Sequence, residues 1–563
     1  MALLKKPILD VRNLSVGFRT ESGVVSAVRD FNMNVEQGEV MGLVGESGSG
    51  KSVTSKTIMR LMPGNAVIDP ASRVTLHHDG ADHDVLKLKG RGLKMVHGGV
   101  VSMIFQEPMA SFAPAIRLGD QIVETIRIHR GLSREEARKI GIELFDRVGI
   151  PMPDVRFDQY VFELSGGMRQ RAMIAMALST QPKLLIADEP TTALDVTIQA
   201  QVLDLLLELR EQMGMSMVFI THDLGVIGKI ADRVTVLKKG EVVEAGFADD
   251  VLYDPRHAYT RELIEALPHL DELPPPPAET PEPLLEVRGI NIEFPMNTGG
   301  RRDQSVFHAV KNANLTLPKG RIIGLVGESG SGKTTLGKCI LGATPIASGE
   351  VEFFTDPPVK FTHPRQIKRR KFAQMAQMIF QDPHASLNPR LTVRDIIAEP
   401  LIATGLVKDK KEIDARVKRV AERCKIDITH LRRFPHAFSG GQRQRICIAR
   451  ALISEPKFIV ADESVAALDV STQSEILKLL KELRDDLGIT FLFISHDLSV
   501  IANLCDRVVV IKHGDLVEEG TVQEIFLNPQ QEYTKKLIGA IPLLERRGGP
   551  GGHETPTIME PAE

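Results

Sequence analysis

The sequence predicts an α/β fold in which one domain, built on a mainly parallel sheet, occurs twice along the chain. One observation is a repeat: G-E-S-G-S-G-K-S at 45–52 recurs as G-E-S-G-S-G-K-T at 327–334, and later motifs recur 274 residues on (Ser165 to Ser439). Another is a set of short, continuously apolar runs, typical of strands buried on both faces of a sheet. The third is a length of 563 residues, far beyond a single core.

The composition is that of an ordinary soluble globular protein, with 42% hydrophobic and 25% charged residues. A net charge of −3 gives no overall basic field, so nucleic acid is not suggested as a partner. No apolar run approaches the ~20 residues that span a bilayer, and the first ten residues lack the apolar core of a signal peptide. We therefore expect a cytosolic chain that does not cross a membrane itself. The four scattered cysteines predict reduced, buried thiols.

The repeat divides the chain into four expected segments. They are a first repeat with its extension at 1–272, a Pro-rich linker at 273–283, a second repeat with its extension at 284–547, and a disordered Gly/Pro/Glu-rich tail at 548–563. The linker, L-P-P-P-P-A-E-T-P-E-P, is compatible with an extended polyproline strap, a linker without set geometry, or a Pro-rich docking peptide.

Each repeat shows the same order of expected elements. Alternating apolar and polar residues at its start predict half-exposed antiparallel strands. Three apolar runs predict buried strands, and a charged helical pattern between Gln106 and Ser165, and again between Gln381 and Ser439, predicts a separate helical subdomain. In order, these are Ile8–Val16 and Leu284–Ile292, Glu39–Val44 and Arg321–Val326, Arg134–Val148 and Lys411–Cys424, Leu184–Ala187 and Phe458–Ala461, and Met217–Ile220 and Phe491–Ile494.

The pattern G-x-x-x-x-G-K-[ST] between a strand and a helix is a P-loop. Its glycines let backbone N–H groups converge on phosphate oxygens, the lysine reaches the β- and γ-phosphates, and the Ser or Thr hydroxyl binds Mg²⁺. Kinases, GTPases and motor ATPases share this pattern, so a single copy indicates only nucleotide binding. The predicted ATP-binding residues here are Gly45, Ser47, Gly48, Gly50, Lys51 and Ser52, and Gly327, Ser329, Gly330, Gly332, Lys333, Thr334 and Thr335.

An apolar strand that ends in two acids follows in each repeat, as L-L-I-A-D-E-P at 184–190 and F-I-V-A-D-E-S at 458–464. Asp188 and Asp462 are predicted to hold Mg²⁺. Glu189 and Glu463 are predicted to polarise the attacking water, a role that contributes ~10²–10⁴ in rate. Two surface acids would fit neither the buried run before them nor the duplication.

A Ser-Gly-Gly stretch opens a helical pattern 23 residues before each Asp-Glu pair (Ser165 to Asp188, Ser439 to Asp462). The serines suit the N-cap, and the glycines leave backbone N–H groups bare at the positive helix end, which makes an anion site. An ordinary capped helix would explain one copy. The stretches are Ser165, Gly166 and Gly167, and Ser439, Gly440 and Gly441.

With these motifs the chain resembles the ATP-binding-cassette (ABC) family, whose signature motif is this Ser-Gly-Gly stretch. The resemblance implies roles for further residues. His222 and His496, which follow apolar runs, match its switch histidine, Gln106 and Gln381 match its Q-loop, which senses Mg²⁺ and water, and Asp195 and Asp469 match its D-loop. Phe18 and Phe294 match its adenine-stacking aromatic, although strand-core phenylalanines fit as well.

The resemblance also implies a head-to-tail pairing of the two cassettes within the chain. Lys51, Asp188, Glu189 and His222 would then face the signature of the second repeat, and Lys333, Asp462, Glu463 and His496 the signature of the first. ATP would hold the pair together and hydrolysis would release it. Both sets are complete, so we predict two active sites. Ser464 departs from the family's usual Pro, but Glu463 beside it is intact.

A further repeat, D-P-R-H-A-Y-T-R-E-L-I-E-A-L-P at 254–268 and N-P-Q-Q-E-Y-T-K-K-L-I-G-A-I-P at 528–542, looks like the C-terminal region of oligopeptide/dipeptide/nickel importer ATPases. The resemblance implies an ATP- and Mg²⁺-dependent transport ATPase on the cytoplasmic face of a bacterial inner membrane. Its expected partners are two membrane permeases and an extracytoplasmic binding protein. With no cysteine cluster, no iron–sulfur site is expected.

Two rival functions remain open: a soluble tandem ABC ATPase in translation or DNA repair, and an exporter ATPase. The short Pro-rich linker and the absence of zinc-type cysteine pairs disfavour the first, and the repeated extension disfavours the second. Two smaller features have modest interpretations. His77, His78 and His83 are expected in a polar hairpin loop rather than a metal site, and 368–371 on a solvated helix face.

Overall fold

The computed structural model describes residues 7–21, 23–191, 194–265, 267, 273, 275, 281–297, 304–465, 468–542 and 544. Most of the predicted linker and the whole predicted tail at 548–563 lie outside these residues. These residues form two compact units, one within 7–191, 200–265, 542 and 544, and the other within 194–199 and the described part of 267–541. Each repeat is described below by itself.

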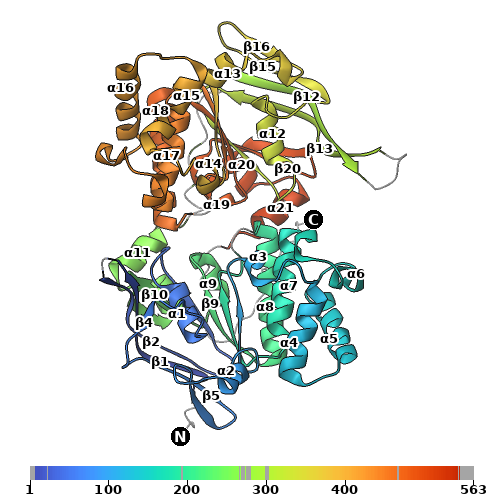
Figure 1. The fold of residues 1–563 in the computed structure, drawn as a ribbon. Coiled ribbons are helices and arrows are strands. Elements are labelled where there is room, and N and C mark those ends of the chain that lie inside the picture. Colours follow the sequence, from blue (N-terminus) through green and yellow to red (C-terminus); the bar gives the residue numbers. More distant parts are fainter. Residues whose placement is uncertain are drawn as a thin grey trace, which may run out of the picture. The chain divides into compact units, whose positions relative to one another are not determined.

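Each repeat contains a six-stranded sheet that is parallel except for one edge strand, as predicted (Figure 1). In the first repeat the order is β11-β10-β3-β9-β8-β7, and in the second it is β17-β18-β19-β14-β20-β21. The strands are β3 (Val40–Val44), β7 (Val101–Ile104), β8 (Leu184–Asp188), β9 (Ser216–Ile220), β10 (Arg233–Lys238) and β11 (Glu241–Phe247), and β14 (Ile322–Val326), β17 (Ala376–Ile379), β18 (Phe458–Asp462), β19 (Thr490–Ile494), β20 (Arg507–Lys512) and β21 (Asp515–Thr521).

The predicted central strands are confirmed by their burial. Every residue of β3, β8 and β9 is buried, and so is every residue of β14, β18 and β19. Both faces of these strands are covered, which explains why their sequences are continuously apolar rather than alternating.

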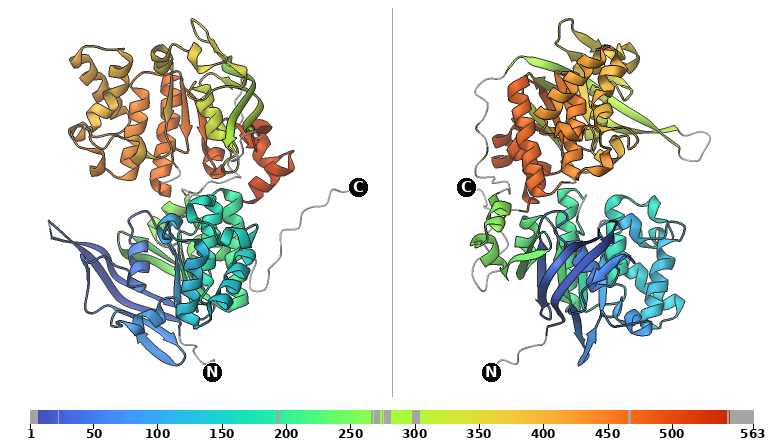
Figure 2. Two further views of the ribbon diagram at one scale, coloured as in Figure 1. Left: turned by 45° about the vertical axis from the view of Figure 1, so that its right-hand side comes forward. Right: turned by 60° about the vertical axis from the view of Figure 1, so that its left-hand side comes forward.

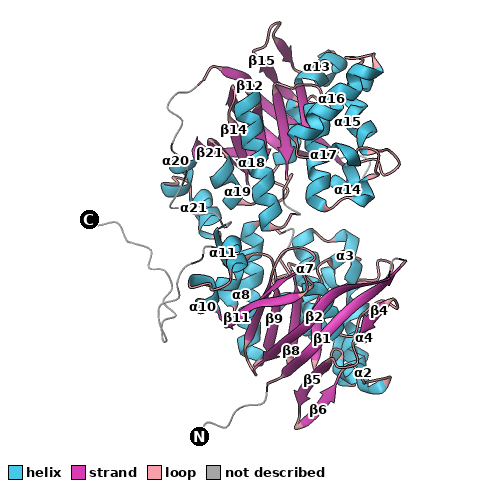
Figure 3. Ribbon diagram, turned by 90° about the vertical axis from the view of Figure 1, so that its left-hand side faces the viewer, coloured by secondary structure: helices cyan, strands magenta, loops and turns pink. Residues whose placement is uncertain are grey.

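An antiparallel sheet occupies the start of each repeat, also as predicted (Figure 3). Its first two strands are long, and their alternating residues place one face on the core. The strands are β1 (Leu9–Thr20), β2 (Gly23–Val35), β4 (Ala66–Ile68), β5 (Arg73–His78) and β6 (Ala81–Asp84), and β12 (Pro283–Asn297), β13 (Gln304–Pro318), β15 (Ser348–Phe353) and β16 (Val359–Phe361).

His77 and His78 lie on β5 and His83 on β6, so they occupy the two strands of a hairpin rather than its loop. His77 Nδ1 lies 2.7 Å from Asp82 Oδ1. Within the described residues, no group of three or more His, Cys, Asp or Glu side chains has an arrangement that could hold a metal ion. All four cysteines are free and buried, which confirms the prediction of unpaired core thiols.

The helical subdomain is present in both repeats. In the first repeat, its helices (cyan) lie on the side of the fold away from the antiparallel strands (blue) (Figure 2). Its elements are α4 (Leu118–Arg130), α5 (Arg134–Arg147), α6 (Pro153–Phe157), η1 (Val161–Glu163) and α7 (Gly166–Leu178), and α15 (Val393–Thr404), α16 (Lys410–Arg423), η3 (Ile428–His430), η4 (Pro435–Ala437) and α17 (Gly440–Leu452).

The other helices follow strands of the parallel sheet, lie between the antiparallel strands and β7 or β17, or form the C-terminal extensions. They are α1 (Lys51–Ile58), α2 (Arg91–Val96), α3 (Pro108–Ser111), α8 (Val196–Met213), α9 (Leu224–Ile230), α10 (Ala248–Tyr253) and α11 (Ala258–Glu265), and α12 (Lys333–Ile340), η2 (Pro364–Gln366), α13 (Arg369–Met375), α14 (Pro383–Ser386), α18 (Val470–Leu487), α19 (Leu498–Leu504), α20 (Val522–Leu527) and α21 (Glu532–Gly539). Residues 368–371 are exposed at the start of α13, as predicted. None of the helices within the described ranges combines the length and apolarity needed to span a bilayer.

In each repeat, a hydrophobic cluster joins the antiparallel sheet to the parallel sheet. In the first repeat, fully buried Leu9 and Phe31 of the antiparallel sheet share a cluster with Ile186 and Ile220 of the parallel sheet. In the second repeat, Leu285 and Phe353 share a cluster with Phe458 and Ile494. Because the parallel strands pack in this way, their carboxyl ends are held together at one edge of the sheet.

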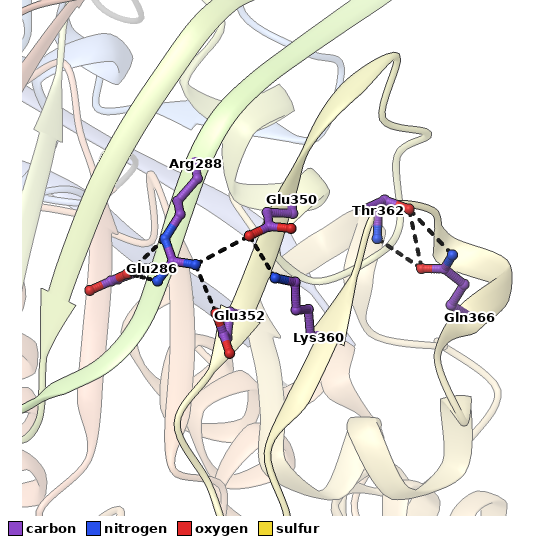
Figure 4. Close-up of polar contacts among 7 residues, drawn as sticks. All are labelled: Glu286, Arg288, Glu350, Glu352, Lys360, Thr362 and Gln366. Atoms are coloured by element: carbon purple, nitrogen blue, oxygen red, sulfur yellow. Dashed lines mark hydrogen bonds and ion pairs between the residues drawn. The ribbon is translucent and has the colours of Figure 1, made fainter.

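A network of charges covers part of the antiparallel sheet of the second repeat (Figure 4). Arg288 on β12 forms ion pairs with Glu286 and, across the strands, with Glu350 at 3.2 Å and Glu352 at 2.9 Å. Lys360 on β16 forms a second ion pair with Glu350 at 2.7 Å. One guanidinium therefore pairs with three carboxylates, of which Glu350 also pairs with Lys360.

We expect Arg288→Met to lower the melting temperature by about 1–2 °C near pH 7, because it leaves three carboxylates close together. Hydrogen bonds from Lys360 and Arg288 lower the pKa of Glu350. The stability that Glu350 gains from these bonds is therefore present above the pKa of the carboxyl in the unfolded chain, and it is lost as the pH falls through the lower pKa in the folded protein. Thermal unfolding from pH 3 to 8 should show the deficit shrinking below about pH 4. Arg12→Met, which removes a pair with Asp10 alone, is the control and should cost less.

Candidate functional site

The carboxyl ends of four neighbouring parallel strands converge on one edge of each sheet. In the first repeat, the glycine-rich loop follows β3 and His222 follows β9. Asp188 is the last residue of β8 and Glu189 comes directly after it, and Gln106 follows β7. The second repeat places Lys333, His496, Asp462, Glu463 and Gln381 in the same order after β14, β19, β18 and β17. Loops at this edge of an open α/β sheet are where ligands bind.

The P-loop folds as the sequence predicts, and its lysine points back into the loop. Lys51 begins α1, and its Nζ donates to the carbonyls of Gly45 at 2.7 Å and Glu46 at 2.8 Å. Lys333 begins α12 and makes the same bonds to Gly327 and Glu328, at the same two distances. Both lysines are buried, so the loop carries a buried positive charge at a helix N-terminus.

The first loop glycine is required by both its backbone angle and its neighbours. Gly45 has φ of 148°, and a Cβ there would lie 2.2 Å from the Leu237 carbonyl oxygen. Gly327 has φ of 155°, and a Cβ would lie 2.1 Å from the Ile511 carbonyl oxygen. Any side chain would force the loop away from the adjacent strand, so glycine sets its shape.

Two of the three residues predicted to contact Mg²⁺ in each repeat lie together, whereas the third, Gln106 or Gln381, donates to the neighbouring glutamate. Ser52 Oγ donates to Asp188 Oδ1 at 3.1 Å, and Thr334 Oγ1 donates to Asp462 Oδ1 at 2.9 Å. Burial raises the pKa of both aspartates, more than the hydroxyl hydrogen bonds lower it. A cation bound nearby would stabilise the charged carboxylates and so offset the effect of burial on their pKa.

Ser55 is a site residue that the sequence analysis missed. Its Oγ donates to Asp188 Oδ2 at 3.2 Å, so Asp188 accepts two hydroxyls. The available signal was its position three residues after Ser52 on α1, which places the two on one helix face. The equivalent position of the second repeat is Gly337, which has no hydroxyl to donate, and a Cβ there would lie 2.9 Å from Ile494 Cδ1, so Ile494 would have to shift to admit a side chain.

The two candidate catalytic glutamates have left-handed backbones. Glu189 has φ of 49° and Glu463 has φ of 44°, which is unusual for a non-glycine residue. Each backbone N–H donates at 2.9 Å to the last residue of the neighbouring strand, Ile220 or Ile494. This turn at the strand end carries the carboxylate out of the sheet and toward the loops.

Each glutamate is held between the Q-loop glutamine and the histidine. Gln106 Nε2 donates to Glu189 Oε2 at 2.8 Å, and His222 Nδ1 lies 3.7 Å from Glu189 Oε1. In the second repeat, Gln381 Nε2 donates to Glu463 Oε2 at 2.5 Å, and His496 Nδ1 lies 3.3 Å from Glu463 Oε1. The predicted glutamine, glutamate and histidine therefore form one cluster in both copies.

The charge state of this cluster depends on pH. Burial works to lower the pKa of His496, but the Glu463 carboxylate outweighs it and the pKa is raised. Burial works to raise the pKa of Glu463, but the hydrogen bond and charge of His496 outweigh it and the pKa is lowered. The contribution of His496 to the stability of the fold is lost as the pH rises through its raised pKa. The contribution of Glu463 is lost as the pH falls through its lowered pKa.

His496→Gln should therefore destabilise the protein most between about pH 4.5 and 6.5, by about 2–4 °C in melting temperature, and less at pH 9. Thermal unfolding of both proteins across pH 4–9 measures this difference. His308→Gln is the control, because His308 forms an exposed pair with Glu293 at 3.3 Å and should change little. A deficit that stayed constant over the whole range would contradict the ion-pair explanation.

The Ser-Gly-Gly stretches begin helices α7 and α17, as predicted. Ser165 Oγ accepts a hydrogen bond from Met168 N, and Ser439 with Gln442 forms a reciprocal capping box. A Cβ at Gly166 would meet nothing within 4 Å, and one at Gly440 would meet only Leu468 Cδ2 at 3.8 Å. Folding within the repeat therefore does not explain these two glycines, whereas Gly441 is needed because a Cβ would lie 2.2 Å from Thr472 Cγ2.

Other predicted residues lie away from this cluster. Phe18 is half-buried on β1 opposite Val25, and Phe294 is 41% exposed on β12 opposite Phe307. Asp195 Oδ1 accepts from Ile198 N and its Oδ2 accepts from Ser329 N of the second P-loop at 3.3 Å, whereas Asp469 caps α18. Ala193 and Ala467 of the same loops lie outside the described residues.

The two repeats differ behind the catalytic glutamate. In the first, Gln170 Nε2 of α7 donates to the carbonyl of Pro190, next to Glu189. In the second, both amide atoms of Gln444 and the hydroxyl of Ser464 are buried and have no hydrogen-bond partner within the described part of the chain. The Pro-to-Ser difference read from the sequence thus coincides with a different bonding of the loop.

A tyrosine from each C-terminal extension also contacts the P-loop, which the sequence analysis did not foresee. The backbone N–H of Glu46 donates to Tyr259 Oη at 3.2 Å, and that of Glu328 donates to Tyr533 Oη at 3.1 Å. The only signal in the sequence was the repeated Tyr-Thr pair at the 274-residue offset.

The comparison with protein families matches both repeats and both extensions. A family model described as ABC transporter matches residues 28–192 and 310–466. A second, described as the oligopeptide/dipeptide transporter C-terminal region, matches residues 243–286 and 517–562.

Curated relatives match along nearly their whole length. The peptidoglycan transport ATP-binding protein YejF of Agrobacterium fabrum is 45% identical over 537 residues, covering 95% of this chain and 96% of the relative. The glutathione import ATP-binding protein GsiA of Escherichia coli K12 is 43% identical over 567 residues, covering 96% of this chain and 90% of the relative. Among solved structures, cbiO1 from Clostridium perfringens, part of the ABC transporter complex cbiONQ, is 29% identical with a TM-score of 0.38, covering 44% of this chain and 92% of that one.

Proposed function

The chain belongs to the ABC transporter family, and we propose that it is the ATP-hydrolysing subunit of a binding-protein-dependent importer, with both cassettes on one chain. Relatives named for glutathione import and peptidoglycan transport support peptides or related small solutes as its cargo. These relatives favour import over the soluble translation or repair role considered from the sequence.

One observation carries the catalytic part of the proposal. The same lysine, hydroxyl–aspartate pair and glutamine–glutamate–histidine cluster occurs at the same sheet edge of both repeats. Ion pairs with a purely structural role would not require the same set of residues in both repeats. Nor would they require a glycine-rich loop beside the set and a strained glutamate backbone within it. Two hydrolytic sites are therefore proposed.

Each side chain has a role that follows from its position. Lys51 and Lys333 leave their loop carbonyls for the β- and γ-phosphates of ATP. Glu189 and Glu463 orient the attacking water and accept its proton, while Gln106 and Gln381 hold those carboxylates in place. His222 and His496 contact the γ-phosphate and stabilise the negative charge that develops there.

The hydroxyl–aspartate pairs suit Mg²⁺. Ser52 with Asp188, and Thr334 with Asp462, present only hard oxygen donors, which this cation prefers, and no sulfur or imidazole. When bound, Mg²⁺ would neutralise charge on the β- and γ-phosphate oxygens. The raised pKa of both buried aspartates is consistent with sites whose charge is balanced only when a cation binds.

The two cassettes are proposed to pair head-to-tail, so that each signature helix completes the nucleotide site of the other cassette. The N-termini of α7 and α17 offer N–H groups to phosphate. Gly166 and Gly440 support this arrangement, because neither is required by its own fold and both would let a ligand approach the helix backbone closely.

The proposed partners are two membrane permeases and an extracytoplasmic binding protein. The chain would act at the cytoplasmic face of a bacterial inner membrane, where ATP is available and the permeases expose their loops. The C-terminal regions at 243–286 and 517–562, shared with oligopeptide/dipeptide transporters, support this class of partner.

Co-purification followed by reconstitution tests the proposal. The chain should purify with proteins rich in apolar 20-residue segments, and vesicles containing that complex and its binding protein should take up a labelled peptide or glutathione only with ATP. A Lys51→Ala, Lys333→Ala double variant should assemble equally but not transport. Recovery of ribosomes or DNA instead of membrane proteins would contradict an importer.

A further inference from the structure

The repeated C-terminal extension contacts the P-loop, a contact that the match to its family model does not describe. In each repeat, the first turn of its last helix, α11 or α21, carries a tyrosine that reaches back to the P-loop. Tyr259 is 2% exposed and accepts from the Glu46 N–H, and Tyr533 does the same for Glu328. The bond recurs between equivalent residues, so it is built into both copies.

The peptide that the tyrosine holds is the one that the P-loop lysine uses. Lys51 Nζ donates to the Gly45 carbonyl and Tyr259 accepts from the Glu46 N–H, and these two groups belong to one peptide unit. Lys333 and Tyr533 hold the peptide unit between Gly327 and Glu328 in the same way. A shift of this peptide unit would move the Gly45 or Gly327 carbonyl that accepts from the resting lysine, and also the loop N–H groups that follow it.

A lysine of the sheet reinforces each tyrosine. Lys238 Nζ at the end of β10 lies 4.0 Å from the centre of the Tyr259 ring, and Lys512 Nζ lies 4.7 Å from that of Tyr533. A cation over the ring holds it in place. Burial raises the pKa of Tyr533 to about 12, so the hydroxyl keeps its proton at any physiological pH.

A glutamate fixes the turn that precedes each tyrosine. Glu244 on β11 accepts at 2.8 Å from the N–H of Arg256 and at 3.1 Å from that of His257. Glu518 on β21 accepts from the N–H groups of Gln530 and Gln531 at 2.7 and 3.2 Å. Burial works to raise the pKa of both glutamates, but hydrogen bonds that include these N–H groups lower it, so the anchors stay charged.

These contacts form a continuous path from the sheet, through the glutamate anchor and the tyrosine, to the P-loop. We propose that Tyr259 and Tyr533 are positioning residues for ATP binding, through which the C-terminal extension holds each P-loop in its nucleotide-accepting shape. The inference deepens the proposed ATPase function and rests on it. It assigns to the extension an effect on nucleotide affinity, in addition to any partner it contacts.

The test is Tyr259→Phe and Tyr533→Phe, singly and together. Phenylalanine keeps the buried ring and the lysine contact but removes the acceptor oxygen, so the N–H of Glu46 or Glu328 loses its partner. We expect the double variant to raise the KM and the Kd for ATP about fivefold, with kcat changed less than about twofold. Hydrogen exchange should become faster in peptides that cover 45–50 and 327–332.

Three further variants separate positioning from general stability. Tyr160→Phe is the matched control, because Tyr160 stacks on Phe162 in the helical subdomain and should leave KM unchanged. Glu244→Ala should raise KM as Tyr259→Phe does, and combining the two should add little, since both act through one bond. Glu244→Gln, which keeps one acceptor oxygen, should have a smaller effect.

The outcomes are distinct. Unchanged KM and Kd in a folded double variant would overturn the inference, as would a fall in kcat and melting temperature at constant KM. Additive effects of Glu244→Ala and Tyr259→Phe would overturn the path through the tyrosine. A parent protein that binds ATP without hydrolysing it would contradict the proposed ATPase, while Kd and hydrogen exchange would still decide the inference.

Discussion

Replacing Glu189 and Glu463 together by Gln is expected to lower ATP hydrolysis by ~10²–10⁴-fold and to leave ATP binding within about twofold. Glutamine keeps the size of the side chain but cannot accept the proton of the attacking water. The loss should therefore fall on kcat, with KM nearly unchanged. Steady-state hydrolysis and equilibrium binding of a fluorescent ATP analogue measure the two effects separately.

The control for this variant is Glu455→Gln. Glu455 also has a positive φ, 53°, but its side chain is exposed and lies outside the site. If the loss came from disturbing a left-handed backbone, the control would lose activity too. The single variants test the prediction of two active sites: inactivity after changing Glu189 with full activity after changing Glu463 would contradict it.

The sequence was sufficient to predict the repeated α/β fold because the hydrophobic pattern of the strands and the capping residues of the helices indicated the same structure. The run L-L-I-A at 184–187 is continuously apolar and became a fully buried strand, and Ser165 and Ser439 became the N-caps expected of them. These features depend on residues close in the chain, for which hydrophobic period and capping chemistry are reliable guides.

The rest depended on contacts between distant segments. Nothing around Glu189 indicates its left-handed backbone, which is imposed by the hydrogen bond of its N–H to Ile220. Nor could the sequence show that Gln106, 83 residues earlier, donates to its carboxylate. Tyr259 was hidden in a motif recognised only as a family extension, and its contact with Glu46 spans 213 residues.

The head-to-tail arrangement allows a test whose outcome reverses if the arrangement is wrong. It compares two double substitutions in the Glu189→Gln, Glu463→Gln background, where ATP is retained rather than hydrolysed. One is Lys51→Ala with Gly440→Asp, and the other is Lys51→Ala with Gly166→Asp. In the proposed pairing, the first damages one composite site twice and spares the other, whereas the second damages both sites.

The aspartate substitutions suit this test because they repel phosphate without disturbing the fold. A Cβ at Gly166 meets nothing within 4 Å, and one at Gly440 meets only Leu468 at 3.8 Å. A carboxylate at a helix N-terminus also stabilises the helix, so a loss of nucleotide cannot be attributed to unfolding.

We expect the pair Lys51→Ala, Gly440→Asp to retain about one ATP per chain after gel filtration, and the pair Lys51→Ala, Gly166→Asp to retain almost none. Self-contained cassettes would give the opposite result, because Lys51 and Gly166 would then belong to one site. If the two proteins retained equal amounts of ATP, neither signature helix would belong to one particular nucleotide site. Gly64→Asp, an exposed glycine whose Cβ also meets nothing, is the control for the added charge and should leave both values unchanged.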